Sequence, residues 1–350
     1  MKNIDKIEFG SDFHLCEYPT GDSLLNIYET CNLYIDGRQA LIDLIVANKW
    51  ENLWLPTYYC YDFISSLIPY INIKYYECTP FDDIHNEVAA IDSGDKDAMV
   101  VVNYFGLKSA IGAFAGKMII EDHSHDLVSD WALKSQADWC FASLRKTLPI
   151  ADGGILWSPK GLKLPPQPKL RNASENLANN RYHAMRMKRD YLVNGLCGDK
   201  ETYRKIYIET ERGFDTLPIS NISSTSFDIV SSIDIRLWYE QKRNNWLLLS
   251  QNLNFNDAVK IFKADGENAE KTPFSLMLIC ADVVTRDLLR AELIKNNIYP
   301  AILWDVPNVF HNEARVLSKT LLSVHCDGRY SSDEIEVLIR KINGILRCLK

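Results

Sequence analysis

Asp122 and Lys146, which stand 24 positions apart, have the surroundings in this sequence that best suit chemistry. Asp122 ends the apolar run 118–122, which has the composition of a buried parallel strand. Lys146 lies in a turn between the aromatic run 139–142 and the pair Gly153–Gly154. An acid at a strand exit and a lysine on a nearby loop suit pyridoxal phosphate, which needs a carboxylate at its ring nitrogen and an amine for a Schiff base. This pairing is our working hypothesis for the chain.

Each of these residues also has an ordinary structural interpretation. Lys146 attacks an aldehyde only when its amine is neutral, which requires burial and cations such as Arg145 nearby; otherwise it is a solvated loop lysine. Asp122 would hold the ring nitrogen protonated, or it would cap the following helix. His125 would donate to the cofactor's phenolic oxygen or cover its ring, whereas His123 is expected to be structural. With no cysteine or further histidine nearby in the sequence, the two histidines predict no metal site.

A cofactor phosphate needs hydrogen-bond donors and a positive end, and the helix start at Gly37, Arg38 and Gln39 offers both. Glycine lets the main chain approach closely, and Ser143, three positions before the lysine, adds a hydroxyl donor. A glycine before a helix is also an ordinary cap, in which case the Arg38 side chain would face solvent.

The segment 56–61 follows a strand and concentrates three tyrosines and one thiol, with Tyr59 and Cys60 at its centre. Such rings would stack on a flat cofactor. A domain or subunit interface explains the same composition equally well, so both interpretations stay open.

The elements that must position these residues alternate between helical periodicity and short apolar runs. Helices are predicted at 37–46 and 63–69, and strands at 52–56, 71–76, 98–103 and 117–121. This alternation predicts an α/β fold in which helices cover both faces of a mostly parallel sheet.

The second half of the sequence predicts a smaller unit. We expect a proline-rich loop at 160–168, polar helical sequence at 175–211, one long helix at 226–253, a strand at 275–280, a helix at 286–296 and a closing helix capped at 331–334. In the long helix, Ile229, Ile233 and Leu237 would share one face. We therefore predict a large α/β domain at 1–225, with a lead-in of about 30 residues, and a small α+β domain at 226–350.

The composition narrows the class of protein. The 350-residue chain is 47% hydrophobic and 24% charged, with a formal net charge of −7. An acidic balance argues against nucleic acid or an anionic membrane as the main partner. No signal peptide or membrane-spanning run is visible, and the nine cysteines include no Cys-x-x-Cys pair. We therefore expect a soluble, cytoplasmic protein with reduced thiols.

Taken in order, these segments resemble the DegT/StrS nucleotide-sugar aminotransferases, which are fold-type I pyridoxal-phosphate enzymes. The family has a Gly-x-x-Ala-Leu helix start, a proline segment with an aromatic residue, a Glu-Asp-x-x-Gln/His strand exit, a turn from serine to lysine, and a Gly-Gly pair. The matching segments here are Gly37–Leu41, Pro56–Tyr61, Glu121–His125, Ser143–Lys146 and Gly153–Gly154. The tail at 321–331 is similar as well.

The resemblance implies a role for each matched residue. Lys146 would carry the Schiff base, Asp122 would face the ring nitrogen, and His125 would face the ring oxygen. Asn221 would reach the phosphate held by a neighbouring subunit, which implies a homodimer with shared sites. The phosphate itself would be held by Ser143 and by the amides of Arg38 and Gln39.

The sequence departs from the family pattern at two places. The step from Ser143 to Lys146 is shorter than in typical members. An ungapped register also puts Cys60 where an aromatic residue usually stacks on the ring, which leaves Tyr59 or Tyr61 to substitute. These departures concern the substrate more than the cofactor.

The function implied by the resemblance is transfer of an amino group from a donor such as glutamate to a keto sugar linked to a nucleotide, in surface polysaccharide or related sugar biosynthesis. The same cofactor also serves dehydratases, lyases and amino-acid transaminases, and a chain of this fold can lose catalysis and act as a binding subunit. Trp304 and Arg329 would line the substrate mouth or would be structural.

Overall fold

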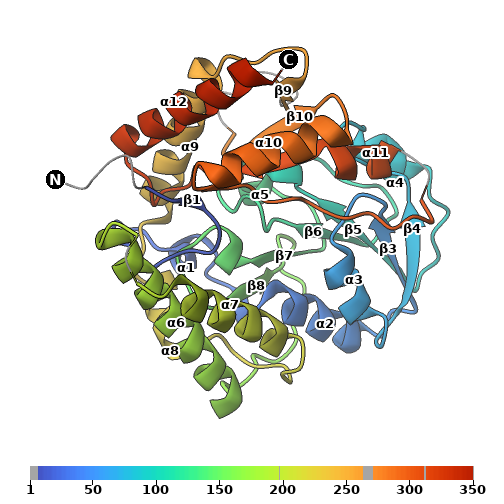
Figure 1. Cartoon of the computed structure of the whole chain (residues 1–350). Helices are drawn as coiled ribbons and strands as arrows, with labels where there is room; N and C mark the ends of the chain where they lie inside the picture. The colour runs from blue at the N-terminus through green and yellow to red at the C-terminus, as the bar shows by residue number, and fades with distance from the viewer. Residues whose placement is uncertain (1–6, 197, 263–270, 311–312, 350) are drawn as a thin grey trace.

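The computed structural model describes residues 7–196, 198–262, 271–310 and 313–349, which include a seven-stranded sheet (Figure 1). Its strands are β2 (Cys31–Tyr34), β3 (Asn52–Pro56), β4 (Asn72–Tyr76), β5 (Asp97–Val102), β6 (Ile119–Asp122), β7 (Trp139–Ser143) and β8 (Gly154–Trp157). They lie in the order β2-β8-β7-β6-β5-β3-β4. Only β8 runs against its neighbours in this described sheet, so the carboxyl ends of β5, β6 and β7 meet at one edge.

Helices connect these strands, as the alternation in the sequence predicts. The main ones are α2 (Gly37–Asn48), α3 (Tyr61–Leu67), α4 (Ile84–Ala89) and α5 (Asp130–Leu133), and α2 packs against β7 and β8. Shorter pieces are α1 (Leu24–Ile27) and the single-turn helices η2 (Tyr104–Gly106) and η3 (Leu144–Lys146). Strand β5 is buried at every position, which explains its continuous apolar run. The predicted α/β fold with a mostly parallel sheet is confirmed.

Helices α6 (Asn172–Val193) and α7 (Lys200–Phe214) follow the sheet and pack side by side (Figure 1). Next come α8 (Ser224–Val230) and α9 (Ile235–Asn252).

The prediction of one long helix at 226–253 is wrong, because the chain breaks between α8 and α9. Asp234 caps the new helix by accepting a hydrogen bond from the Leu237 backbone N–H at 3.0 Å. Ile229 and Ile233 are buried, whereas Leu237 is 49% exposed, so the three do not share a face. The helical spacing of these apolar residues ran across two separate helices.

The remaining elements form a second, antiparallel sheet with helices. Its strands are β9 (Val259–Ile261), β10 (Leu276–Cys280) and β12 (Leu321–Val324), in the order β12-β10-β9. Around it lie α10 (Val283–Lys295), β11 (Ile298–Tyr299), α11 (Glu313–Thr320) and α12 (Ser332–Cys348). Ser331 and Glu334 form the capping box predicted for the closing helix. The domain boundary at 225/226 falls within α8 and stays a prediction.

The start of the described chain is bound to distant elements. β1 (Phe9–Gly10) pairs with β11, and the Arg181 guanidinium contacts the Asp12 carboxylate at 2.6 Å. The Tyr207 hydroxyl donates to the Phe13 carbonyl at 2.6 Å. We call residues 9–15 the amino-terminal strap. Within the described residues, no helix is both long enough and apolar enough to cross a membrane.

Candidate active site

Asp122 ends β6, at the edge of the sheet where the parallel neighbours β5 and β7 also end. Its buried carboxylate accepts a hydrogen bond from the Ser124 backbone N–H at 2.8 Å and another from the Tyr59 hydroxyl at 2.6 Å. Burial and the adjacent carboxylate raise the pKa of Tyr59 well above its ordinary value, so the phenol remains a donor. The acid is therefore held in one orientation.

Lys146 lies in η3, directly after β7, in a turn closed by the Leu144 N–H, which donates to the Gly153 carbonyl at 2.9 Å. The lysine is partly buried, and within the described part of the chain no hydrogen bond or ion pair engages its amine. Lys146 borders a cavity of about 290 Å³ whose lining includes Arg181 and Arg329. An unengaged amine at a cavity is available to a ligand.

Arg145, the cation beside this lysine, is held by Glu211 of α7 through hydrogen bonds of 2.8 and 2.5 Å. Arg181 of α6 approaches the same carboxylate at 3.3 Å. Burial would raise the pKa of Glu211, but the two guanidinium groups lower it to about 2. Glu211 therefore compensates the charge of Arg145, which weakens any effect of that charge on Lys146.

His125 is 3% exposed, and its Nδ1 accepts a hydrogen bond from the Phe105 backbone N–H at 3.1 Å. Burial lowers the pKa of His125 well below its ordinary value; Lys146 and Lys242 lower it further, and the Asn103 carbonyl opposes them. The ring is therefore neutral, and because Nδ1 is an acceptor, its hydrogen lies on Nε2. A neutral imidazole in this tautomer donates a hydrogen bond, as the predicted role at a ring oxygen requires.

The start of α2 lies against the turn before Lys146. A Cβ added at Gly37 would stand 2.9 Å from the Ser143 backbone N, so only glycine fits at this contact. The Ser143 N–H in turn donates to the Ser124 hydroxyl at 2.8 Å, which ties this turn to the exit of β6. Gly37 and Ser143, both predicted at the phosphate, are thus brought together.

Of the two amides predicted at the phosphate, that of Gln39 is engaged by the protein. The Gln39 N–H donates to the carboxylate of Asp36, the N-cap residue of α2, at 2.8 Å, and the Gln39 side chain accepts from the Ser220 N–H at 2.8 Å. The Arg38 guanidinium forms an ion pair with Asp215. The structure therefore places Arg38 and Gln39 at the predicted helix start but gives their side chains structural partners.

Two guanidinium nitrogens in this neighbourhood lack partners. Among the described residues, the Nε atoms of Arg38 and Arg145 are buried and form no hydrogen bond. Both arginines act on the buried carboxyl of Asp36 at the start of α2. Unused buried donors of this kind suit an anion.

Of the tyrosine segment, only Tyr59 reaches Asp122. Cys60 is the N-cap residue of α3 and lines a separate cavity of about 420 Å³ together with Trp304. The Tyr61 ring stacks on Tyr75 at 6.1 Å. Neither Cys60 nor Tyr61 has a recorded contact with Asp122 or His125 in the described structure, so the residue that would stack on a cofactor ring stays a prediction.

Asn221 lies in the segment that Gln39 holds against α2. Its side-chain oxygen accepts from the Ile222 N–H at 2.8 Å, and its own N–H donates to the Lys169 carbonyl at 3.3 Å. Its predicted contact with a phosphate of another subunit stays a prediction.

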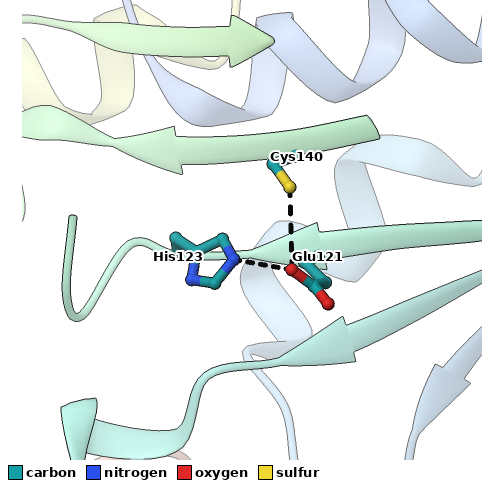
Figure 2. A group of neighbouring side chains, drawn as sticks. All are labelled: Glu121, His123 and Cys140. Atoms are coloured by element: carbon teal, nitrogen blue, oxygen red, sulfur yellow. Dashed lines mark hydrogen bonds and ion pairs between the residues drawn. The ribbon is translucent and has the colours of Figure 1, made fainter. Parts of the chain in front are cut away.

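A second polar cluster, formed by Glu121, His123 and Cys140, lies beside the Asp122 exit (Figure 2). His123 Nε2 is 2.8 Å from a Glu121 carboxylate oxygen, and the Cys140 thiol is 3.7 Å from the same oxygen. The second Glu121 oxygen accepts from the Trp131 indole N–H at 2.9 Å, and Asn103 contacts His123 Nδ1 at 3.2 Å.

The sequence argument against a metal supposed that no cysteine accompanies the histidines, and that premise is wrong. The pairing of β6 with β7 puts Cys140 opposite Glu121, and the three donor atoms lie within 4.8 Å of one another. Burial raises the pKa of Cys140 well above its ordinary value, so the thiol stays protonated and is a poor metal ligand. Since each member has a protein partner, the cluster is a structural network, and the absence of a metal stays a prediction.

The sequence did not predict the aromatic contacts around His125, although Trp304 was named as a possible residue of the substrate mouth. Trp304 stacks on its ring with centroids 5.6 Å apart and planes 14° apart, and Phe105 and Phe274 lie at 5.6 and 4.4 Å. These contacts join distant segments, so no local pattern signals them. Asp36 could have been predicted as the N-cap residue of α2, because an acid followed three positions later by Gln or Glu is a common pattern at the start of a helix.

Comparison with known proteins gives matches only among solved structures. No protein-family model and no curated protein sequence matches the chain. Spr1654 from Streptococcus pneumoniae, in its PLP form, is similar with a TM-score of 0.61 and 10% identity over 93% of this chain and 90% of that one. DesI, studied with its TDP-sugar product, has a TM-score of 0.58 and 13% identity over 93% and 84%.

A DegT DnrJ EryC1 StrS aminotransferase from Brucella abortus has a TM-score of 0.56 and 13% identity over 95% of this chain and 91% of that one. At such low identity, structural likeness shows the fold and leaves the chemistry to the site. The chain therefore has the fold of these aminotransferases along nearly its whole length.

Proposed function

We propose that the protein is a pyridoxal-phosphate-dependent aminotransferase. It would move an amino group from a donor such as glutamate to a keto sugar linked to a nucleotide, in surface polysaccharide or related sugar biosynthesis. The observation that carries the proposal is the unengaged amine of Lys146, next to a neutral His125 and at the sheet edge where Asp122 ends its strand. The similar structures, one in a PLP form and one with a TDP-sugar product, support the choice of cofactor and substrate.

The residues present fit this cofactor at three points. Asp122 offers a buried, fixed carboxylate for a ring nitrogen. His125 offers an Nε2–H for a ring oxygen. The unpartnered Nε atoms of Arg38 and Arg145, at the helix start where Gly37 packs against Ser143, offer donors for the phosphate.

When bound, the cofactor supplies an electron sink for charge that develops at a substrate carbon. The amine of Lys146 would take the proton from the α-carbon of the amino donor and pass it to the cofactor, and it would move a proton in the reverse direction, onto the sugar carbon that receives the amino group. Asp122 would hold the proton of the ring nitrogen in place. His125, through Nε2–H, would stabilise negative charge on the adjacent oxygen.

The proposal extends to assembly and location. A homodimer would let Asn221 of one subunit complete the phosphate site of the other, and the amino donor and the keto sugar would be its small-molecule substrates. We propose a cytoplasmic enzyme that binds neither nucleic acid nor membrane.

Absorption spectroscopy tests the cofactor. Purified protein with pyridoxal phosphate should develop a visible band that Lys146→Ala lacks and that Lys134→Ala keeps, since Lys134, the C-cap residue of α5, is 65% exposed. Identical, unchanged spectra for the wild type and Lys146→Ala would end the proposal.

The same spectrum separates the reaction types. Glutamate should bleach the band, and a nucleotide-linked keto sugar should restore it, because transfer needs both halves. A band that no amino donor bleaches would favour a dehydratase, a lyase or a non-catalytic binding subunit of the same fold.

A further inference from the structure

Lys242 is a fully buried lysine that the proposed chemistry does not use. It lies in the middle of α9, and its amine is 3.5 Å from the His125 carbonyl oxygen. The amine also lies over the rings of Tyr239 and Phe274, at 4.8 and 5.5 Å from their centroids. A buried cation with one long hydrogen bond is costly, which suggests that its position serves the residue it faces.

No acid forms an ion pair with this amine in the described structure, although the charges of Asp126 and Asp327 act on it and oppose the effect of burial on its pKa. The buried carboxyl of Asp126 instead accepts hydrogen bonds from the Val128 and Ser129 N–H groups. Burial raises the pKa of Asp126, and burial lowers that of Lys242. The positive charge of Lys242 is therefore incompletely compensated where it faces His125.

The groups around the His125 ring come from five segments of the chain. Lys146 of η3 and Lys242 of α9 are the charged groups that act on it, and the Asn103 carbonyl acts against them. The rest of the wall is aromatic, from Phe105, Phe274 and Trp304. Two cations and an apolar wall all oppose a second proton on the ring.

We propose that Lys242 is a positioning residue, which holds the His125 main chain from α9 and disfavours protonation at Nδ1, so that the ring presents Nε2–H to the ligand. The use of that N–H by a cofactor rests on the proposed function, whereas the state of the ring does not. In this way Lys242 of α9 sets the hydrogen-bonding state of His125, which follows β6. The two elements, labelled in Figure 1, are far apart in the sequence.

The test is a titration of the histidine rings by long-range ¹H–¹⁵N NMR, on protein without added cofactor. His125→Gln identifies the His125 signals. In the wild type, these signals should show the neutral Nε2–H form from about pH 5 to 8. In Lys242→Met, the midpoint of their change should move to higher pH, and Lys242→Arg should restore the wild-type behaviour. Lys242→Gln is the second neutral variant if the methionine variant does not fold.

Lys188 provides a matched control. It is also buried, at 2% exposure, but its amine donates to the carbonyls of Gly10 and Asp12 and its charge acts on His325. Burial lowers the pKa of His325 to about 4, with Arg329 and Lys188 adding to the effect. Lys188→Met should therefore move the His325 signals and leave those of His125 in place.

Comparison of the neutral Lys242 variants with Lys188→Met decides the proposal. Movement of His125 in the neutral Lys242 variants, with none in Lys188→Met, supports the proposal. A His125 titration that is the same in the wild type and the neutral Lys242 variants, or that Lys188→Met shifts equally, overturns it. Since the measurement needs no cofactor and no turnover, failure of the aminotransferase proposal would not produce either result.

Discussion

The exit of β6 presents two different kinds of polar chemistry on neighbouring residues. Glu121, His123 and Cys140 form a buried network in which the carboxylate has a protein donor on each oxygen. Asp122, one position on and directed to the other face of the strand, ends β6 beside β7, the strand that leads into Lys146, whose amine has no partner in the described protein.

This difference shows how a structural polar cluster can be distinguished from a ligand-binding site. A buried polar group usually satisfies its hydrogen bonds within the protein, and the Glu121 network does so. Lys146 keeps an unengaged amine next to a cavity, where a ligand can engage it. Substitutions on the two faces should therefore change different properties.

The largest expected effect is the loss of activity in Asp122→Asn. An amide cannot hold a ring nitrogen protonated as a carboxylate does, so amino transfer should fall by on the order of 10²-fold or more. Stability should change by less than about 1 kcal/mol, because the amide oxygen still accepts from the Ser124 N–H. Steady-state rates and urea unfolding measure the two, and a stable variant with full activity would remove Asp122 from the site.

Glu121→Gln should show the opposite pattern. It removes a charge-assisted hydrogen bond to His123 in a fully buried position, which should lower the free energy of unfolding by about 2–3 kcal/mol. The exposed Glu209→Gln serves as control, with a change within about 0.5 kcal/mol. If Glu121→Gln unfolds like the wild type but loses activity while folded, the two faces do not differ as described.

Acid unfolding extends the comparison to the wall of the Lys146 cavity. Burial would raise the pKa of Asp327, but Arg329, bound at 2.8 Å, lowers it to about 2. The folded pKa lies below the ordinary value of 3.8, so this pair stabilises the protein above about pH 4 and loses its effect as the pH falls toward 2.

The size of that contribution is about 2 kcal/mol. The difference in unfolding free energy between the wild type and Asp327→Asn should therefore shrink between pH 5 and about 2. The Asp305 side chain, which pairs with Lys319, is 80% exposed, so Asp305→Asn should show no such dependence. If this difference stays constant across the range, the ion pair between Asp327 and Arg329 does not stabilise the protein as described.

Chelation should have the smallest effect. If the Glu121 network is held by hydrogen bonds alone, EDTA should leave the melting temperature unchanged, and metal analysis of the protein should find no bound zinc. Cys140→Ala should cost about 1 kcal/mol, as an ordinary core substitution does. Zinc that co-purifies and is lost in Cys140→Ala would turn this network into a metal centre.

Much of the fold could be predicted because its signals are local. The strands β3, β5 and β6 are short, mostly buried apolar runs, and the capping box before α12 is visible in four residues. The break before α9 was missed because apolar spacing continued across it, although Asp234 carried an N-cap signal. Apolar spacing alone does not show where one helix ends and the next begins.

The candidate site was predicted less completely, for a physical reason. Asp122, Lys146 and His125 were chosen because their own neighbours in sequence are unusual for an acid, a lysine and a histidine. Cys140 beside Glu121 and Lys242 beside His125 depend on strand pairing and helix packing, which join residues 19 and 117 positions apart. Such neighbours are fixed by the folded chain and leave no local pattern.

The amino-terminal strap has a practical consequence for anyone handling the protein. Ser11, Asp12 and Phe13 form part of the wall of the cavity at Lys146, and Lys188 and Arg329 hold their main chain. A truncation that removes these residues would remove part of that wall although it touches no reacting group. A tag fused to the carboxyl end, after α12, avoids the strap and is the safer choice for binding and rate measurements.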